Sequence, residues 1–220
     1  SKVLKINFID IAIKLMMGET VPKLSHSAFD LDYVGVKASQ FSFTRLKGSD
    51  PVTGVEMAST GEVGCIGDDL NEAFLKSIIS VGFKVEPKSV LLSIGSADKK
   101  IAFLEEAKTL QGMGVKLYAT KGTGAFLQQS NIPVEMLEWT AENNEPSVMS
   151  YLSGKKIDLM IDVPSNIEKA SGSNGYLVRR KAIDQNVSLI TNLEFARRYV
   201  KAISKLKIGD LKIKSWDEYL

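Results

Sequence analysis

The sequence predicts an α/β fold: a doubly wound sheet of about five parallel strands with helices on both faces, preceded by a smaller α+β part. Two observations lead to this fold class. After Pro87, short apolar runs alternate with segments of helical period at close spacing, a pattern typical of strand–helix–strand units. The first of these runs, 89–95, is apolar almost throughout, as expected for a strand that is covered on both faces.

The first part of the chain, up to about residue 86, has a mixed pattern. We expect a helix over 7–17, with Gly18 as its C-cap, and a second helix that begins after Asp68 or Asp69 and ends at Gly82. The inward face of the second helix is expected to hold Leu70, Ala73, Phe74, Ser77, Ile78 and Val81. Strands are expected over 33–38, 54–58 and 63–66. So few strands indicate the tail of a larger domain.

The second part is regular from residue 87 onward. Its expected strands are 89–95, 115–119, 134–139, 157–161 and 188–191. Helices are expected from Asp98 to Leu110, from Gly122 to Ser130, from Pro146 to Leu152, from Gly175 to Gln185 and from Glu194 to Leu206. In the helix that Asp98 begins, we expect Ile101, Leu104, Ala107 and Leu110 to point inward.

Composition excludes several classes of protein. The chain has 220 residues, 44% hydrophobic and 25% charged, which fits one to two globular domains at about 150 residues each. With 28 Lys+Arg against 26 Asp+Glu, the net charge of +2 gives no argument for nucleic acid or a membrane surface as partner. No apolar run approaches the roughly 20 residues of a membrane helix. A single cysteine, Cys65, fits a reducing compartment, and the first residue, Ser1, suggests a piece of a longer chain.

A candidate anion site lies at the end of the second expected parallel strand. In open parallel sheets, ligands bind beyond the carboxyl ends of the strands. There, residues 120–124 bring together two threonines, a lysine and two glycines at a strand-to-helix turn. Backbone N–H groups at such a turn can approach an anion, and the helix N-terminus favours negative charge. A glycine-rich turn with a threonine as a simple N-cap is an equal alternative, because the segment matches neither a Walker loop nor a dinucleotide fingerprint.

Other side chains near strand ends each have a structural alternative. Lys99 and Lys100 could reach the same face or remain in solvent. Trp139 could stack on a ligand or fill the core, and Asn174 has the position of an N-cap. The arginines at 179–180 could pair with an anion or with a neighbouring carboxylate.

The sequence offers no catalytic constellation. Cys65 and His26 are too few for a metal site, and neither has a nucleophile signature around it. The basic run over 197–214 has no interleaved aromatic residues, so we expect a solvated or docking face rather than a nucleic-acid site.

Several strings of residues resemble one enzyme family. Residues 56–63, with Asp50-Pro51 before them and 73–76 after them, resemble the end of the second synthetase half of the carbamoyl phosphate synthetase large chain. Residues 8–10 and 14–19 resemble the helix that precedes it. The strings that resemble its C-terminal regulatory domain, which has the methylglyoxal-synthase-like fold, are 91–95, 118–123, 157–159, 178–182 and 189–192.

The resemblance implies a division of the chain and a parent activity. Residues 1–86 would be the C-terminal remnant of the second ATP-grasp synthetase half, and residues 87–220 the methylglyoxal-synthase-like regulatory domain. The parent is an ATP-dependent ligase that makes carbamoyl phosphate from bicarbonate, glutamine or ammonia and two ATP, with Mg²⁺, for pyrimidine or arginine synthesis. Its ATP and metal residues would precede Ser1, so we expect this fragment to be inactive alone and to hold no cofactor.

The resemblance also implies partners and a location. We expect the rest of the large chain, a glutaminase subunit or domain, an oligomeric assembly, and no nucleic acid or membrane. The location would be cytoplasmic, with the mitochondrion as the alternative. The partner of the regulatory domain would be a small anionic effector: a nucleotide, phosphoribosyl pyrophosphate or N-acetylglutamate.

The effector residues are carried over by the same resemblance. The effector's anionic group would lie at Thr120 and Thr123. The remaining expected contacts are Lys99, Ser93, Trp139, Asn174, Ser165 and Asp162. Asp162 and Ser165 stand where the family commonly has asparagine, and a carboxylate repels an anionic ligand unless a cation intervenes.

Two alternative functions stay open. The first is a lyase like methylglyoxal synthase, with Asp162 as base, although residues 87–220 contain no histidine to act as the usual electrophile. The second is an assembly module that binds no effector.

Overall fold

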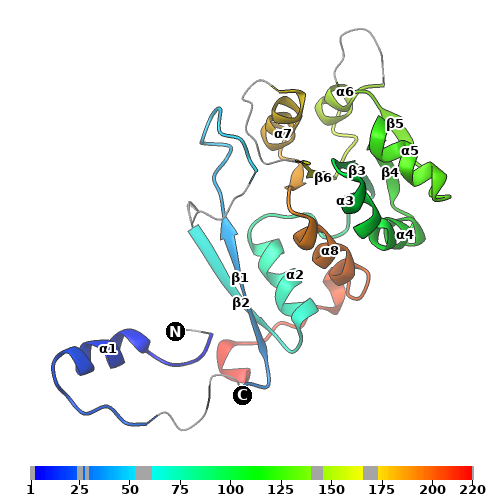
Figure 1. Ribbon diagram of the computed structural model, residues 1–220. Helices are drawn as coiled ribbons and strands as arrows, with labels where there is room; N and C mark the ends of the chain where they lie inside the picture. The colour runs from blue at the N-terminus through cyan, green and yellow to red at the C-terminus, as the bar shows by residue number, and fades with distance from the viewer. Residues whose placement is uncertain are drawn as a thin grey trace.

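The computed structural model describes residues 3–23, 27, 30–52, 61–139, 146–165 and 173–219, and contains two sheets. Strands β1 (Val34–Gln40) and β2 (Gly61–Gly67) form an antiparallel pair. The second sheet is parallel and has the order β5-β4-β3-β6-β7. Figure 1 shows the two sheets in separate parts of the molecule. The expected strand over 54–58 lies outside the described residues.

The parallel sheet confirms the predicted fold class. Its strands are β3 (Ser89–Ile94), β4 (Lys116–Thr120), β5 (Glu135–Leu137), β6 (Leu159–Val163) and β7 (Ser188–Ile190). The central strand β3 is buried throughout, which explains its almost continuous apolar sequence. In the register between β3 and β6, Ser93 lies opposite Asp162.

Helices cover both faces of this sheet. The described helices are α1 (Phe8–Met16), α2 (Leu70–Ser80), α3 (Ala97–Ala102), α4 (Leu104–Gly112), α5 (Lys121–Gln129), α6 (Val148–Ser153), α7 (Asn174–Asp184) and α8 (Leu193–Ile203), followed by the 3₁₀ turns Ile208–Asp210 and Trp216–Glu218. On one face, Leu92 and Ile161 pack with side chains of α2, α4, α5 and α8. On the other face, Leu91 and Met160 pack with α6 and α7. The alternation along each strand therefore supplies two cores.

Three local predictions were wrong. The helix expected after Asp98 is two helices, α3 and α4, because the buried Phe103 lies at the break between them and Ile101 is 64% exposed. Asp98 is inside the first turn, since Ser96 has the N-cap position. Leu70, expected to point inward, is the exposed first residue of α2.

Helix α2 belongs to the same core as the parallel sheet. Asp69, one of the two expected caps, accepts hydrogen bonds from the backbone of Asn71 and Glu72 and so starts this helix. Its Phe74 lies 5.5 Å, centroid to centroid, from Phe195 of α8. Leu75 and Ile78 are buried in the cluster that contains β3. The boundary at residue 86 remains a prediction, and α2 does not form a separate core.

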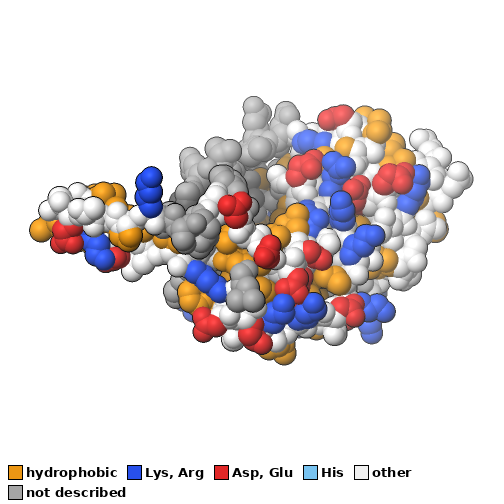
Figure 2. Space-filling view, turned by 90° about the horizontal axis from the view of Figure 1, so that it is seen from below, with side chains coloured by type: hydrophobic (Ala, Val, Ile, Leu, Met, Phe, Trp, Pro, Cys, Tyr) orange, Lys and Arg blue, Asp and Glu red, His pale blue; other side chains and the backbone are white. Residues whose placement is uncertain are grey.

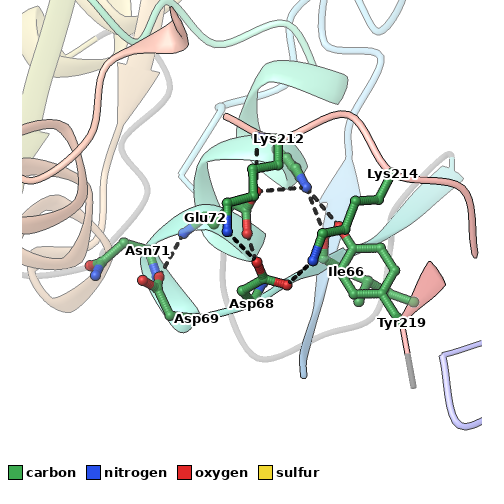
Figure 3. Close-up of polar contacts among 9 residues, drawn as sticks. Ile66, Asp68, Asp69, Asn71, Glu72, Lys212, Lys214 and Tyr219 are labelled. Atoms are coloured by element: carbon green, nitrogen blue, oxygen red, sulfur yellow. Dashed lines mark hydrogen bonds and ion pairs between the residues drawn. The ribbon is translucent and has the colours of Figure 1, made fainter. Parts of the chain in front are cut away.

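The C-terminal segment 207–219 returns across α2 and β2, as Figure 3 shows. Asp68 accepts from Lys212 at 2.7 Å and from Lys214 at 2.6 Å. These two ammonium groups lower the pKa of the Asp68 carboxyl to about 2. Tyr219 receives a hydrogen bond on its hydroxyl from Lys76 at 2.8 Å. Part of the basic run is therefore a docking face within the chain.

Helix α1 lies apart from the sheets at one end of the molecule (Figure 1). It begins at the expected position, where Asn7 accepts from the backbone of Asp10, and Gly18 follows its end with a φ of 77°. None of its residues is buried, and Figure 2 shows apolar side chains on this projecting part. In the described residues, no helix has the length and apolar character that crossing a membrane requires.

Candidate functional site

The carboxyl ends of β3, β4 and β6 lie side by side, because these strands are neighbours in the sheet. Six of the eight predicted residues lie on these strand ends or on the segments that directly follow them: Ser93, Lys99, Thr120, Thr123, Asp162 and Ser165. Gly95 N donates to Val163 O at 2.9 Å and ties the end of β3 to the end of β6. The sheet topology thus gathers the residues that the sequence placed at separate strand ends.

Thr123 has a structural role at this edge. Its hydroxyl accepts from Ile94 N at 2.9 Å and donates to Ile94 O at 3.2 Å. The side chain is 2% exposed. Thr123 therefore fastens the first turn of α5 to the end of β3, and its hydroxyl is already engaged.

The N-terminus of α5 retains unused polar groups. Thr120 is its N-cap and is 5% exposed, yet its hydroxyl makes no capping hydrogen bond. The Lys100 Nζ lies 3.6 Å from the position that a Cβ on Gly122 would take. In the described part of the chain, the Lys100 ammonium group has no hydrogen bond or ion pair, and only the Lys100 backbone is hydrogen-bonded, within α3. An ammonium group and a helix N-terminus together form an electropositive corner.

Lys99 points to a different strand end. Its Nζ donates to Pro164 O at 2.7 Å and to Ser165 O at 3.2 Å, so it holds the segment that follows β6. Gly95 packs against the same segment so closely that a Cβ there would overlap the backbone of Ser165. Lys99 and Gly95 therefore shape this edge of the sheet.

The Asp162 carboxylate is paired with an arginine that comes from α7. Asp162 is 3% exposed, and Arg179 Nη1 donates to its Oδ2 at 2.9 Å. Burial raises the pKa of the Asp162 carboxyl, while the Ser93 hydroxyl and Arg179 act to lower it. Arg179 thus offsets part of the negative charge of Asp162 at this edge of the sheet.

Among the described residues, no hydrogen bond connects Trp139 or Asn174 to the corner at the N-terminus of α5. Trp139 is partly buried and packs against the cluster of Leu137 and Leu152, which is the core-filling alternative. Asn174 is the exposed first residue of α7, and Ser173 caps the helix instead by accepting from Tyr176 N. The expectation that Asn174 is the N-cap was wrong.

A metal site is not indicated. Among the described residues, no group of three or more His, Cys, Asp or Glu side chains could hold an ion. The sequence left open whether Lys100 reaches the site or solvent, and the structure places its Nζ beside Gly122 in the first turn of α5. The partner of Arg179 in the first part of the chain could not be read from the sequence, because Asp50 is 129 residues away.

Comparisons with known proteins agree with this fold. Residues 102–191 match the family described as the MGS-like domain. The chain is 44% identical over 223 residues to the "Multifunctional protein pyr-3" of Neurospora crassa, which covers 96% of this chain and 12% of that protein. It is 43% identical over 224 residues to the "Multifunctional protein pyr1-3" of Dictyostelium discoideum, covering 99% of this chain and 10% of the relative.

A human relative is named for its reaction. The chain is 38% identical over 221 residues to the human "Carbamoyl-phosphate synthase [ammonia], mitochondrial", covering 96% of this chain and 15% of that protein. A methylglyoxal synthase from Elizabethkingia anophelis is a weaker structural neighbour, with 16% identity, a TM-score of 0.42, and coverage of 60% of this chain and 89% of that one. The chain thus spans 10% to 15% of the length of the three sequence relatives.

The parallel sheet and the family match define an α/β protein with an MGS-like domain. The similarity continues through residues outside that domain and covers nearly the whole chain. The chain belongs to the C-terminal MGS-like region of carbamoyl-phosphate synthetase large chains.

Proposed function

We propose that the corner formed by Thr120, Lys100 and the N-terminus of α5 binds a small anionic metabolite. The observation that carries the proposal is the polarity of this corner: the hydroxyl of Thr120 makes no capping hydrogen bond, and the Lys100 ammonium group, which has no ion pair among the described residues, lies at the same helix N-terminus. Such a terminus stabilises a negative charge by about 0.3–1 kcal/mol, and a lysine adds a charged hydrogen bond.

The bound metabolite acts as an allosteric effector of a longer enzyme. That enzyme makes carbamoyl phosphate from bicarbonate, glutamine or ammonia and two ATP, with Mg²⁺, for pyrimidine or arginine synthesis. This chain alone does not perform the reaction. Its partners are the remaining part of the large chain and a glutaminase unit in an oligomer, in the cytoplasm or the mitochondrion. The effector is a nucleotide, phosphoribosyl pyrophosphate or N-acetylglutamate.

The lyase alternative is less well supported by the geometry. Asp162, its expected base, is buried and ion-paired with Arg179 at 2.9 Å, so it is not poised to take a proton from a ligand. An assay for methylglyoxal formation from dihydroxyacetone phosphate distinguishes this activity from effector binding.

Calorimetric titration of the 220-residue chain tests the proposal. The probes are UMP, UTP, IMP, phosphoribosyl pyrophosphate and N-acetylglutamate. For the probe that binds, Lys100→Ala should weaken binding about tenfold, because it removes a charged hydrogen bond. Thr120→Val should also weaken binding, since it removes the hydroxyl and keeps the shape of the side chain.

The control is Lys108→Ala. Lys108 is on α4, pairs with Glu105 at 2.7 Å, and should have no effect on binding. If a folded sample binds none of the five probes, or if Lys100→Ala binds them as the unchanged chain does, the proposed site is wrong. No binding would favour the assembly module.

A further inference from the structure

One polar face of helix α7 forms hydrogen bonds and an ion pair with residues 41–52, a segment of the first part of the chain. Tyr176, Arg179 and Arg180 have the i, i+3, i+4 spacing that puts side chains on one side of a helix. Tyr176 donates to Gly48 O at 3.0 Å, and Arg180 donates to Phe43 O at 2.9 Å. The segment rises from the end of β1 towards α7 (Figure 1).

Arg179 links this segment to the strand ends of the candidate site. Its Nε and Nη2 donate to the two carboxylate oxygens of Asp50, at 2.9 and 2.7 Å. Its Nη1 donates to Asp162 of β6, which lies opposite Ser93 of β3. Burial acts to lower the pKa of Arg179, yet the two carboxylates raise it above its usual value. One guanidinium group is therefore shared between a carboxylate of each part of the chain.

We propose that Arg179 is a positioning residue: through it, a change of charge at the candidate site changes how strongly α7 binds segment 41–52. The proposal rests on the proposed function, because a bound anion supplies the change of charge. An anion bound in the corner at the end of β4 adds negative charge to the same sheet edge as Asp162, because β4 and β6 both flank β3, and so draws Arg179 towards β6. The bidentate pair with Asp50 then weakens, and the segment loosens.

The proposal predicts the opposite effect, a more tightly bound segment, when the negative charge of Asp162 is removed. Asp162→Asn removes one of the two carboxylates that compete for the guanidinium, while the amide oxygen can still accept a hydrogen bond. Arg179 is then held more strongly by Asp50. A purely structural contact would give the reverse result, since removing an anchor of Arg179 would loosen everything attached to it.

Hydrogen exchange of the segment is the measurement. The backbone N–H groups of Arg45 and Ser49 donate within the segment, to Ser42 O and Leu46 O, so they report its opening. With UMP or N-acetylglutamate at saturation, exchange over 43–52 should become about fivefold faster, which is the lower end of typical allosteric coupling. In the absence of any probe, Asp162→Asn should slow the same exchange.

Two lysine variants separate coupling from simple attachment. Arg179→Lys keeps the charge but loses the fork that engages both carboxylates, so the exchange response to the probe should disappear although the probe still binds. The matched control is Arg180→Lys. Arg180 pairs with Asp184 of its own helix and donates to backbone oxygens of the segment, so this variant should raise the exchange with and without probe and preserve the response.

The two proposals fail in different ways. If no probe binds in calorimetry, the proposed function fails, and the probe-free Asp162→Asn comparison still decides the link through Arg179. If exchange in Asp162→Asn becomes faster or does not change, the coupling is overturned. It is equally overturned if a bound probe leaves exchange over 43–52 unchanged in the native chain, or if Arg179→Lys responds as the native chain does. Thermal melting of each variant confirms that it is folded.

Discussion

Neighbouring residues of the same chemical type have different roles in this chain. Lys99 holds two backbone carbonyls after β6, whereas Lys100 faces the first turn of α5 without an ion pair among the described residues. Thr123 ties α5 to β3, whereas the Thr120 hydroxyl makes no capping hydrogen bond. Side-chain direction within one helical turn, rather than residue type, decides which of them can meet a ligand.

The buried hydroxyl of Thr123 should contribute measurably to stability. Thr123→Val leaves the buried N–H of Ile94 without its acceptor and should lower the free energy of unfolding by about 1–3 kcal/mol. Thr109→Val is the control, because the Thr109 hydroxyl donates to Glu105 O on an exposed surface. Urea unfolding of both variants measures the difference, and equal midpoints would contradict the structural role of Thr123.

Asp68 should make stability depend on acid pH. Lys212 and Lys214 lower its folded pKa from 3.8 to about 2, so its stabilising contribution is present above the unfolded pKa and is lost as the pH falls from about 4 to 2. Asp68→Asn should flatten this part of the pH dependence in urea unfolding. Asp217→Asn is the control, as a carboxylate on the same docked segment. An unchanged acid profile in Asp68→Asn would count against the ion pairs.

At the scale of elements, two glycines with different neighbours give a matched pair. Gly95→Ala would push a Cβ into the Ser165 backbone and should cost about 1–3 kcal/mol of overpacking. Gly124→Ala would meet only the flexible Met136 side chain, at 2.6 Å from its Cγ, and Met136 is partly exposed and can move. Chemical denaturation should therefore give a lower free energy of unfolding for Gly95→Ala than for Gly124→Ala. The opposite order would show that residues 163–165 can shift to accommodate the added Cβ.

The elements themselves were largely predictable, because burial on both faces leaves its mark on a strand sequence. The all-buried β3 and the glycine after α2 were found from local patterns. The division at Phe103 was not, since an apolar residue at a helix break looks like one inside a helix. Asn174 and Ser173 are both good caps, and the choice between them depends on where the chain leaves the segment before α7.

The site was predictable only in part. The rule that parallel strands end at one edge located Thr120, Thr123 and Asp162 together. The pairing of Arg179 with Asp50 joins residues far apart in the chain, and no local pattern reports such a contact. Asp162 could therefore be named from the sequence, but its pairing with an Arg179 that is also held by Asp50 could not.

At the scale of the whole molecule, the shared core should make unfolding a single event. Leu75 of α2 is buried in the same cluster as β3, so Leu75→Ala should cost about 2–5 kcal/mol and destabilise both parts. The two tryptophans report separately: Trp139 follows β5, and Trp216 lies on the docked C-terminal segment near Lys5. With Trp139→Phe and Trp216→Phe as single-tryptophan backgrounds, both fluorescence transitions should coincide and shift together; two separate midpoints would contradict unfolding as a single event.

The projecting helix α1 has a practical consequence for the purified chain. Ile9, Ile13 and Met16 are 69%, 55% and 84% exposed, and they give the projecting helix an exposed apolar surface. Two chains that meet through this apolar surface attract one another. Light scattering of concentrated samples should therefore detect self-association, and Met16→Glu should weaken it. The exposed apolar surface of α1 should therefore influence the storage and crystallisation of this chain as much as the parallel sheet does.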